Sequence, residues 1–196
     1  MNKTFLTPDN SLLLLVDYQQ SMIKGVGSGD RVAMRQSAMA SAKAAKILSI
    51  PVILTVIDPK MNGEFFKEIS DLFPGQEVIA RSVPSFDAFD DPAVSKAIAD
   101  AGRKKLVISG LWTSMCFAFT ALTALEKGMD VYGIMDAAGD ATPQAHTYGV
   151  ERMLQAGVVP TTWITLVSEW MHDWKNPKAG DLVTEVYSKY NATIGI

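Results

Sequence analysis

The sequence is poor in the residues that form disulfides and hold metals. Its 196 residues include one cysteine, Cys116, and two histidines, His146 and His172. A single cysteine excludes an intramolecular disulfide. These three side chains also lack the number and spacing of a usual zinc site. We therefore expect a protein without a bound metal or other cofactor.

Long apolar runs and basic clusters are also missing. The apolar run at residues 12–16 is far shorter than the roughly 20 residues that a membrane span needs, and too short for the core of a signal peptide. The 18 basic and 21 acidic residues are mixed along the chain, with a net charge of −3. The sequence therefore contains no basic patch that would bind the phosphate backbone of a nucleic acid. We expect a cytoplasmic protein that binds neither membranes nor nucleic acids.

The composition, with 48% hydrophobic and 20% charged residues, is that of an ordinary globular protein, and the length fits one domain, residues 1–196. Short apolar runs alternate with longer helical patterns, which predicts an α/β fold: a parallel sheet with helices on both faces, or three-layer α/β/α sandwich. The expected strands are 12–17, 51–57, 77–80, 104–109, 130–135 and 158–161, and the expected helices are 31–47, 92–101, 116–127 and 142–155.

Three tryptophans mark the last part of the chain. Trp163, Trp170 and Trp174 are spaced at i, i+7 and i+11, which places them on one stripe of a helix. Such a stripe could pack on the body of the domain or dock on a second subunit, because aromatic residues are enriched at interface cores. We therefore interpret residues 163–196 as a C-terminal helical segment that contributes to oligomer contacts.

Three chemically useful residues follow predicted strands. Asp17 follows the first strand, Arg81 the third and Cys116 the fourth. In parallel sheets the ligand crevice lies beyond the carboxyl ends of the strands, so the three should meet there. Cys116 also falls at the start of a helix, where the unpaired N–H groups and the dipole favour a thiolate.

Each of the three residues also has an ordinary structural interpretation. A lone cysteine can be a small buried hydrophobe, Asp17 can cap a turn, and Arg81 can be a surface residue. If they converge, Cys116 would act as nucleophile and Asp17 would carry its proton to a leaving group. Arg81 stays protonated and would act electrostatically, and backbone N–H groups before the helix would hold an oxyanion.

Segments spread over most of the chain carry a family pattern: residues 14–19, 78–81, 109–116, 128–131, 136–137, 152–153 and 169–174. In these segments, from about residue 11 to 174, the chain resembles the isochorismatase-like cysteine hydrolases, and most closely their YcaC-like branch. The resemblance implies a six-stranded sheet of order 3-2-1-4-5-6 and a catalytic triad of Asp17, Arg81 and Cys116. It also implies a cis peptide between Leu111 and Trp112 that turns the N–H groups of Trp112 and Cys116 toward an oxyanion.

The chain departs from other members of that family in informative ways. The cation of the triad is most often lysine, and the arginine at position 81 cannot share in proton transfer. Nicotinamidases carry an Asp-x-His metal motif where this chain has Asp58-Pro59-Lys60, so zinc-dependent nicotinamide hydrolysis is not expected. True isochorismatases lack the cysteine, so Cys116 argues against cleavage of an enol ether.

The predicted function is therefore a cysteine hydrolase that cleaves a C–N bond of a small amide-type substrate through a thioester acyl-enzyme. The alternative is a reactive-thiol or redox-responsive oligomer without turnover. The resemblance also implies a homo-oligomer, with ring-shaped assemblies in the YcaC-like branch. As residues that flank a small, partly apolar ligand we name Gln19, Phe86, Trp112 and Phe117.

Other motifs receive structural interpretations. Gly25, Gly27 and Gly29 begin eight residues after Asp17 and lack the final spaced glycine of a dinucleotide site, so we expect a mobile loop at the crevice. His146 and His172 have no partner at metal-ligand or triad spacing and are interpreted as surface or packing residues. Asp136, after the fifth strand, is interpreted as a cap of the following loop.

Overall fold

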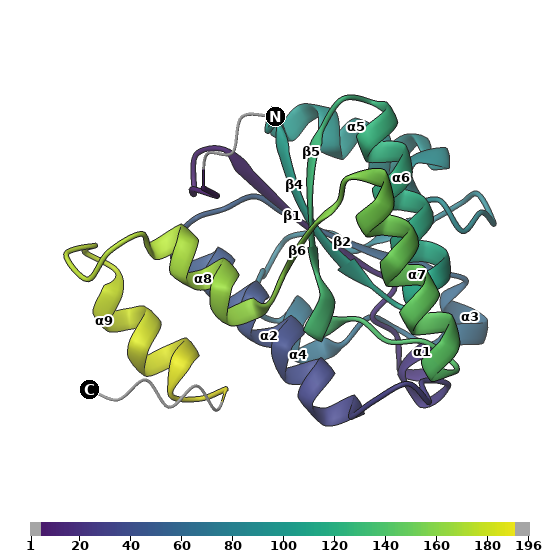
Figure 1. The fold of residues 1–196 in the computed structure, drawn as a ribbon, viewed down its shortest axis with the longest axis horizontal. Helices are drawn as coiled ribbons and strands as arrows, with labels where there is room; N and C mark the ends of the chain where they lie inside the picture. Colours follow the sequence, from purple (N-terminus) through teal and green to yellow (C-terminus); the bar gives the residue numbers. More distant parts are fainter. Residues whose placement is uncertain (1–4, 191–196) are drawn as a thin grey trace.

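The computed structural model describes residues 5–190. The first four residues of the expected domain and the last six of its C-terminal segment lie outside that range. Six parallel strands form one sheet in the order β3-β2-β1-β4-β5-β6, which confirms the predicted fold (Figure 1). The strands are β1 (Ser11–Val16), β2 (Val52–Ile57), β3 (Ile79–Arg81), β4 (Lys105–Gly110), β5 (Asp130–Ile134) and β6 (Val159–Thr161).

Helices cover both faces of the sheet. Figure 1 shows α2, α4 and α8 on one side, and α5, α6 and α7 on the other. The longer helices are α2 (Arg31–Ile47), α5 (Pro92–Ala101), α6 (Ala118–Glu126), α7 (Pro143–Ala156) and α8 (Trp163–Met171). The short ones are α1 (Gln20–Lys24), α3 (Pro59–Asn62), α4 (Lys67–Ser70) and α9 (Ala179–Leu182).

Strand β1 is apolar throughout because it is buried on both faces. Leu13 and Leu15 belong to the core formed with α2 and α8. Leu12 and Leu14, which alternate with them, belong to the core formed with α5, α6 and α7. Successive side chains of a strand point to opposite faces, so a central strand needs an apolar residue at every position. This burial fixes where β1 ends, at Val16.

Capping residues start the helices where the sequence indicates. The Asp30 carboxylate accepts hydrogen bonds from the N–H groups of Val32 and Ala33, as expected of an N-cap. Asp91 caps α5 and Thr142 caps α7 in the same way, and each is followed by proline at the first helical position.

Two predicted boundaries near the strand ends are wrong. The third strand is Ile79–Arg81 rather than 77–80, so Arg81 ends the strand instead of following it. The helix expected at 116–127 begins at Ala118, after a π-helical turn at Thr113–Phe117. The N–H of Phe117 bonds to the carbonyl of Trp112, five residues back, at 3.4 Å. A single π-helical turn has no repeating apolar pattern, so the sequence did not predict where the regular helix begins.

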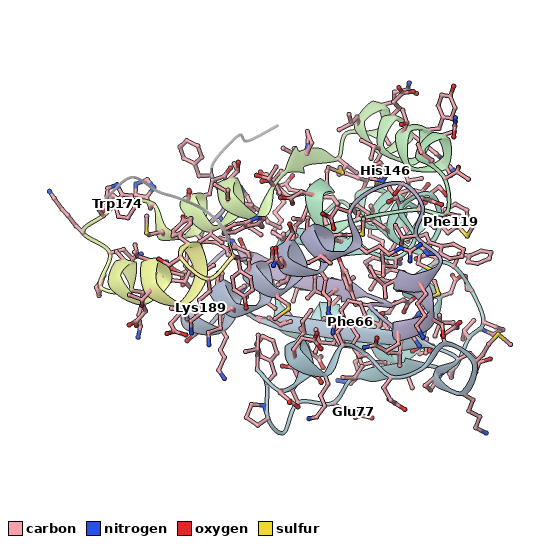
Figure 2. All side chains as sticks on the ribbon, turned by 90° about the horizontal axis from the view of Figure 1, so that it is seen from below. Phe66, Glu77, Phe119, His146, Trp174 and Lys189 are labelled. Atoms are coloured by element: carbon pink, nitrogen blue, oxygen red, sulfur yellow. The ribbon has the colours of Figure 1, made fainter. Side chains whose placement is uncertain are left out.

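The tryptophan stripe is broken in the structure. Helix α8 ends at Met171, and the next residue, His172, has a positive φ of 68°. Trp163 and Trp170 are buried in the body of the domain, whereas Trp174 lies beyond the helix with 59% of its surface exposed. Figure 2 shows Trp174 at the opposite end of the molecule from His146 and Phe119. Two of the three tryptophans therefore pack on the domain.

None of the helices within residues 5–190 has the length and hydropathy needed to cross a bilayer.

Close contact between β1 and β4 predicts the effect of one substitution. A methyl group at Gly110 would lie 2.7 Å from both the Cβ and the carbonyl oxygen of Val16. We expect Gly110→Ala to lower the free energy of unfolding by about 1–3 kcal/mol, because neither strand can move apart without breaking the sheet. Urea denaturation measures the loss.

Gly29→Ala is the matched control, since a methyl group there would meet nothing within 4 Å. It should stay within about 0.5 kcal/mol of the wild type. Equal effects of the two substitutions would contradict the tight packing of β1 against β4.

Candidate active site

Asp17 is placed by the end of β1 and by its neighbour β2. It is the first residue after the strand, and its φ of 57° lies in the left-handed region that aspartate tolerates better than most residues. Its N–H donates to the Thr55 carbonyl, and its Oδ1 accepts from the Thr55 hydroxyl, both at 3.0 Å. The carboxylate is fully buried. Thr55 therefore fixes one of its two oxygens.

Arg81 binds the other oxygen of that carboxylate. Its Nη2 forms an ion pair with Asp17 Oδ2, and neither side chain is exposed to solvent. Nη1 donates to the carbonyl of Ser85 at 2.6 Å, while Nε has no hydrogen-bond partner among residues 5–190. The pair joins the ends of β1 and β3 across β2.

Cys116 completes the group. Its Sγ lies 3.7 Å from Arg81 Nη2, the same nitrogen that is paired with the Asp17 carboxylate. The residue is buried, with 3% of its surface exposed. The structure thus brings together the three side chains that the sequence places at strand ends.

The thiol does not have the lowered pKa that its position near a helix start led us to expect. The pKa of Cys116 is raised from 9.0 to about 12, mainly by burial and also by the neighbouring Asp17 charge, while Arg81 opposes the change. Burial also raises the pKa of Asp17, again against the Arg81 charge. Cys116 therefore rests as a protonated thiol at neutral pH, and that expectation is wrong.

The turn that carries Cys116 is held at several backbone groups. The peptide bond between Leu111 and Trp112 is cis. The Trp112 carbonyl accepts from the N–H of Met115 at 3.1 Å, and the Ser114 N–H donates to Asp140 Oδ2 at 2.7 Å. The Trp112 indole N–H donates to the carbonyl of Met22 at 2.9 Å. The turn is thereby fixed against residues that follow β1 and β5.

The residues named for ligand contact have different surroundings. Gln19 is fully buried, and its amide bonds to backbone groups of Ile57 and Gly63. Phe117 is also fully buried, in the core beneath α6. Phe86 is 55% exposed and packs edge-on against Phe119. Among the four, the structure gives Gln19 and Phe117 packing roles, while Trp112 and Phe86 keep exposed surface.

Two other polar residues interpreted from the sequence have defined partners in the structure. Asp136 does not cap the loop after it, because its carboxylate accepts from the Trp163 N–H at the start of α8, at 3.1 Å. His146 Nδ1 is hydrogen-bonded to the hydroxyl of Thr113 at 2.9 Å. Burial lowers the pKa of His146, and the Asp140 charge opposes that.

Four contributors to the site were missed: Thr55, Ser85, Asp140 and His146. Thr55 had a signal, since it is the polar residue in an otherwise apolar strand. Ser85 acts through its carbonyl, which any residue type supplies. Asp140 reaches the turn from a loop, whose path no periodicity describes, and His146 reaches it from the start of α7, whose position relative to the turn the sequence does not give.

Within the described chain, no group of three or more metal-ligating His, Cys, Asp or Glu side chains is close enough to hold a metal ion.

The family model for the isochorismatase domain matches residues 11–165, which is most of the chain. The chain belongs to the isochorismatase family. The probable hydrolase YcaC of Escherichia coli is 32% identical over 176 residues, covering 89% of this chain and 84% of that protein. The match of the family model confirms the resemblance seen in the sequence.

Solved structures of YcaC share the fold of this isochorismatase-family protein. YcaC from Pseudomonas aeruginosa, described with hexane-2,5-diol and covalent acrylamide, has a TM-score of 0.90 at 29% identity and covers 97% of this chain and 95% of its own. The Escherichia coli structure, described as an octameric hydrolase of unknown specificity, has a TM-score of 0.90 at 31% identity and covers 97% and 94%.

The raised pKa of Cys116 predicts how fast the thiol reacts at alkaline pH. With a pKa of about 12, the native thiol should be alkylated by iodoacetamide about tenfold faster for each pH unit through the whole range above neutrality. In urea the same rate should level off near pH 9, where an unperturbed thiol ionises. The stabilising contribution of the neutral buried thiol is present below about pH 9 and is lost as pH rises toward 12. A native profile that levels off near neutral pH would show that Arg81 dominates instead.

The buried ion pair predicts a large effect when one partner is removed. Arg81→Met leaves the Asp17 carboxylate buried and unpaired, so we expect a loss of about 3–5 kcal/mol in the free energy of unfolding near pH 7. The double variant Asp17→Asn, Arg81→Met should regain part of that loss, measured by urea denaturation. If the losses in the free energy of unfolding measured for Asp17→Asn and for Arg81→Met add up to the loss in the double variant, the two side chains do not interact.

Proposed function

We propose that this isochorismatase-family hydrolase is a cysteine hydrolase that cleaves a C–N bond of a small amide-type substrate through a thioester acyl-enzyme. One observation supports it above the others: the buried Cys116 thiol lies 3.7 Å from Arg81 Nη2, and that nitrogen is also paired with the Asp17 carboxylate. A nucleophile, a proton acceptor and a fixed positive charge are thus grouped around one guanidinium nitrogen.

In the first step, Cys116 Sγ attacks the substrate carbonyl carbon while its proton passes to Asp17. The raised pKa of the thiol makes this coupling necessary, because little free thiolate exists at neutral pH. The carbonyl electron pair moves onto oxygen. We expect the N–H groups of Trp112 and Cys116 to hold that oxyanion, as the family resemblance implies.

In the second step the oxyanion reforms the carbonyl and the C–N bond breaks. The departing nitrogen takes the proton held by Asp17, so the product is a neutral amine or ammonia and the enzyme carries a thioester. Water then attacks the thioester carbonyl while Asp17 accepts a proton from it. Collapse releases a carboxylic acid, and the proton returns to the sulfur.

Arg81 supports these steps without moving a proton, because a guanidinium stays protonated. Its ion pair counters the effect of burial on Asp17, so the carboxylate can act as the base. The hydrogen bond to the Ser85 carbonyl fixes the guanidinium. Its Nε–H, which has no partner in the described part of the chain, is a buried donor that an acceptor atom of a substrate can satisfy.

A relative supplies chemical support for a small amide as ligand. The Pseudomonas aeruginosa YcaC is described with covalently bound acrylamide. Acrylamide is a small amide that also forms bonds with thiols, so a site of this type in the present chain would accept a molecule of that size and polarity.

The alternative of a redox-responsive thiol is less well supported. Oxidation of cysteine depends on thiolate character and on exposure. Cys116 is 3% exposed, and burial raises its pKa. Both features slow oxidation, whereas neither prevents acylation by a substrate that enters the site.

We also infer that the chain forms a homo-oligomer. The Escherichia coli relative is described as octameric, and Trp174 offers an exposed indole at the C-terminal end of the described chain. A ring-shaped assembly, a cytoplasmic location and the absence of a nucleic-acid partner remain predictions.

Trapping of the acyl group tests the proposed hydrolase. The protein is incubated with p-nitrophenyl acetate and with small aliphatic amides, quenched with acid and analysed by intact and peptide mass spectrometry. We expect an acyl group on Cys116 that is absent from Cys116→Ala. Asp17→Asn should slow acylation by about 10²–10⁴, because the thiol loses its proton acceptor.

Asp136→Asn is the matched control. Burial raises the pKa of Asp136, as it does that of Asp17, but the Asp136 carboxylate binds the start of α8 and not the region of the thiol. Its acylation rate should equal that of the wild type. Acylation at other residues only, or an unchanged rate in Asp17→Asn, would overturn the mechanism.

A further inference from the structure

The turn of Cys116 and the glycine segment after β1 are held by one residue, Asp140. The glycine segment is defined here as residues 25–29. Asp140 lies in the loop after β5, is 1% exposed, and binds the turn and the glycine segment through separate atoms. The proposed mechanism gives this buried acid no role.

The carboxylate of Asp140 binds the turn that carries Cys116. Its Oδ2 accepts from the Ser114 N–H at 2.7 Å, two residues before Cys116. Its Oδ1 accepts from the N–H of Ala141 at 2.8 Å, which fixes the carboxylate plane. A charged acceptor makes such a bond shorter and stronger than a neutral one.

The backbone of Asp140 binds the glycine segment. Its carbonyl accepts from the N–H groups of Gly27 at 2.9 Å and Ser28 at 3.1 Å, and its own N–H donates to the Ser28 hydroxyl at 2.9 Å. A methyl group at Gly27 would lie 2.5 Å from the Ala141 carbonyl oxygen, so only glycine allows this approach.

The rest of the turn is anchored independently. The Thr113 N–H donates to the Gly139 carbonyl at 2.9 Å, and the Thr113 hydroxyl bonds to His146. These contacts keep the turn folded when the Asp140 carboxylate is altered. The Ser114 amide is then the group whose direction depends on that carboxylate.

We propose that Asp140 is a positioning residue for acylation of Cys116: its carboxylate holds the Ser114 amide and thereby sets the direction of the turn's N–H groups toward the oxyanion. This inference rests on the proposed function. Stabilisation of an oxyanion depends steeply on donor geometry, and loss of one donor costs about 10²–10³ in rate. A slight rotation of the turn would therefore lower the acylation rate of Cys116 while the protein remains folded.

Two reagents separate positioning from simple stability. p-Nitrophenyl acetate reacts through a tetrahedral oxyanion, whereas iodoacetamide is attacked at its CH2 carbon with loss of iodide and forms no oxyanion. We expect Asp140→Asn to lower the ratio of the acylation rate to the alkylation rate at Cys116 by about tenfold or more. The rates are measured at about pH 8, where His146 is neutral, and the charges of Asp17 and Arg81 are the same in both proteins.

Two further variants accompany Asp140→Asn. Ser28→Ala removes only the hydroxyl that accepts from the Asp140 N–H, and should lower the ratio in the same direction by a smaller factor. Asp136→Asn removes a charge from an aspartate that holds the first amide of α8, and should leave the ratio unchanged. Thermal unfolding of each variant confirms that it is folded at the assay temperature; if Asp140→Asn is not, Ser28→Ala decides.

The outcomes are distinct. A wild-type Cys116 that no ester or amide acylates overturns the proposed function and this inference with it. A wild type that is acylated, with unchanged ratios in Asp140→Asn and Ser28→Ala, overturns this inference alone. An equal fall of the ratio in Asp136→Asn would show a general effect of lost buried charge and would also overturn it.

Discussion

The buried ion pair of Asp17 and Arg81 is the constraint on which the site depends. Two charges without solvent contact are costly unless each is matched and hydrogen-bonded. Here Thr55 binds the second oxygen of Asp17 and Ser85 binds Nη1 of Arg81, while Arg81 Nε has no partner among residues 5–190. The pair can form only if β1 and β3 end at the same level on either side of β2. The central apolar strand, the positive φ of Asp17 and the position of Arg81 at the end of its strand all serve that alignment.

The same pair explains why a thiol in contact with a guanidinium is nevertheless neutral. The positive charge of Arg81 is already compensated by Asp17, so burial decides the pKa of Cys116. In the proposed mechanism the thiol therefore gives up its proton to Asp17 only as it attacks the substrate. Because the guanidinium of Arg81 stays protonated, the proposed mechanism gives proton transfer to Asp17 alone.

The sequence predicted those features that depend on local pattern. The strand order followed from the family resemblance; the apolar run that forms β1 and the helices that begin at residues 31 and 92 followed from the residues. So did the meeting of Asp17 and Cys116, because both come after adjacent parallel strands. Contacts carried by loops or by backbone atoms could not be predicted: Asp140 reaches Ser114 from a distant loop. The pKa of Cys116 depends on burial, which no spacing of residues records.

The π-helical turn at Thr113–Phe117 has a consequence for comparison with related chains. Such a turn contains one residue more than the regular helix that follows it. Removal of a single residue between Trp112 and Ala118 would restore regular winding and rotate every preceding side chain by about 100° around the axis. The sulfur would then leave its carboxylate partner. A one-residue gap in an alignment of this segment therefore means that the cysteine side chain points in a different direction. Residues of related chains should be aligned here by the backbone hydrogen bonds they make and not by their number along the chain.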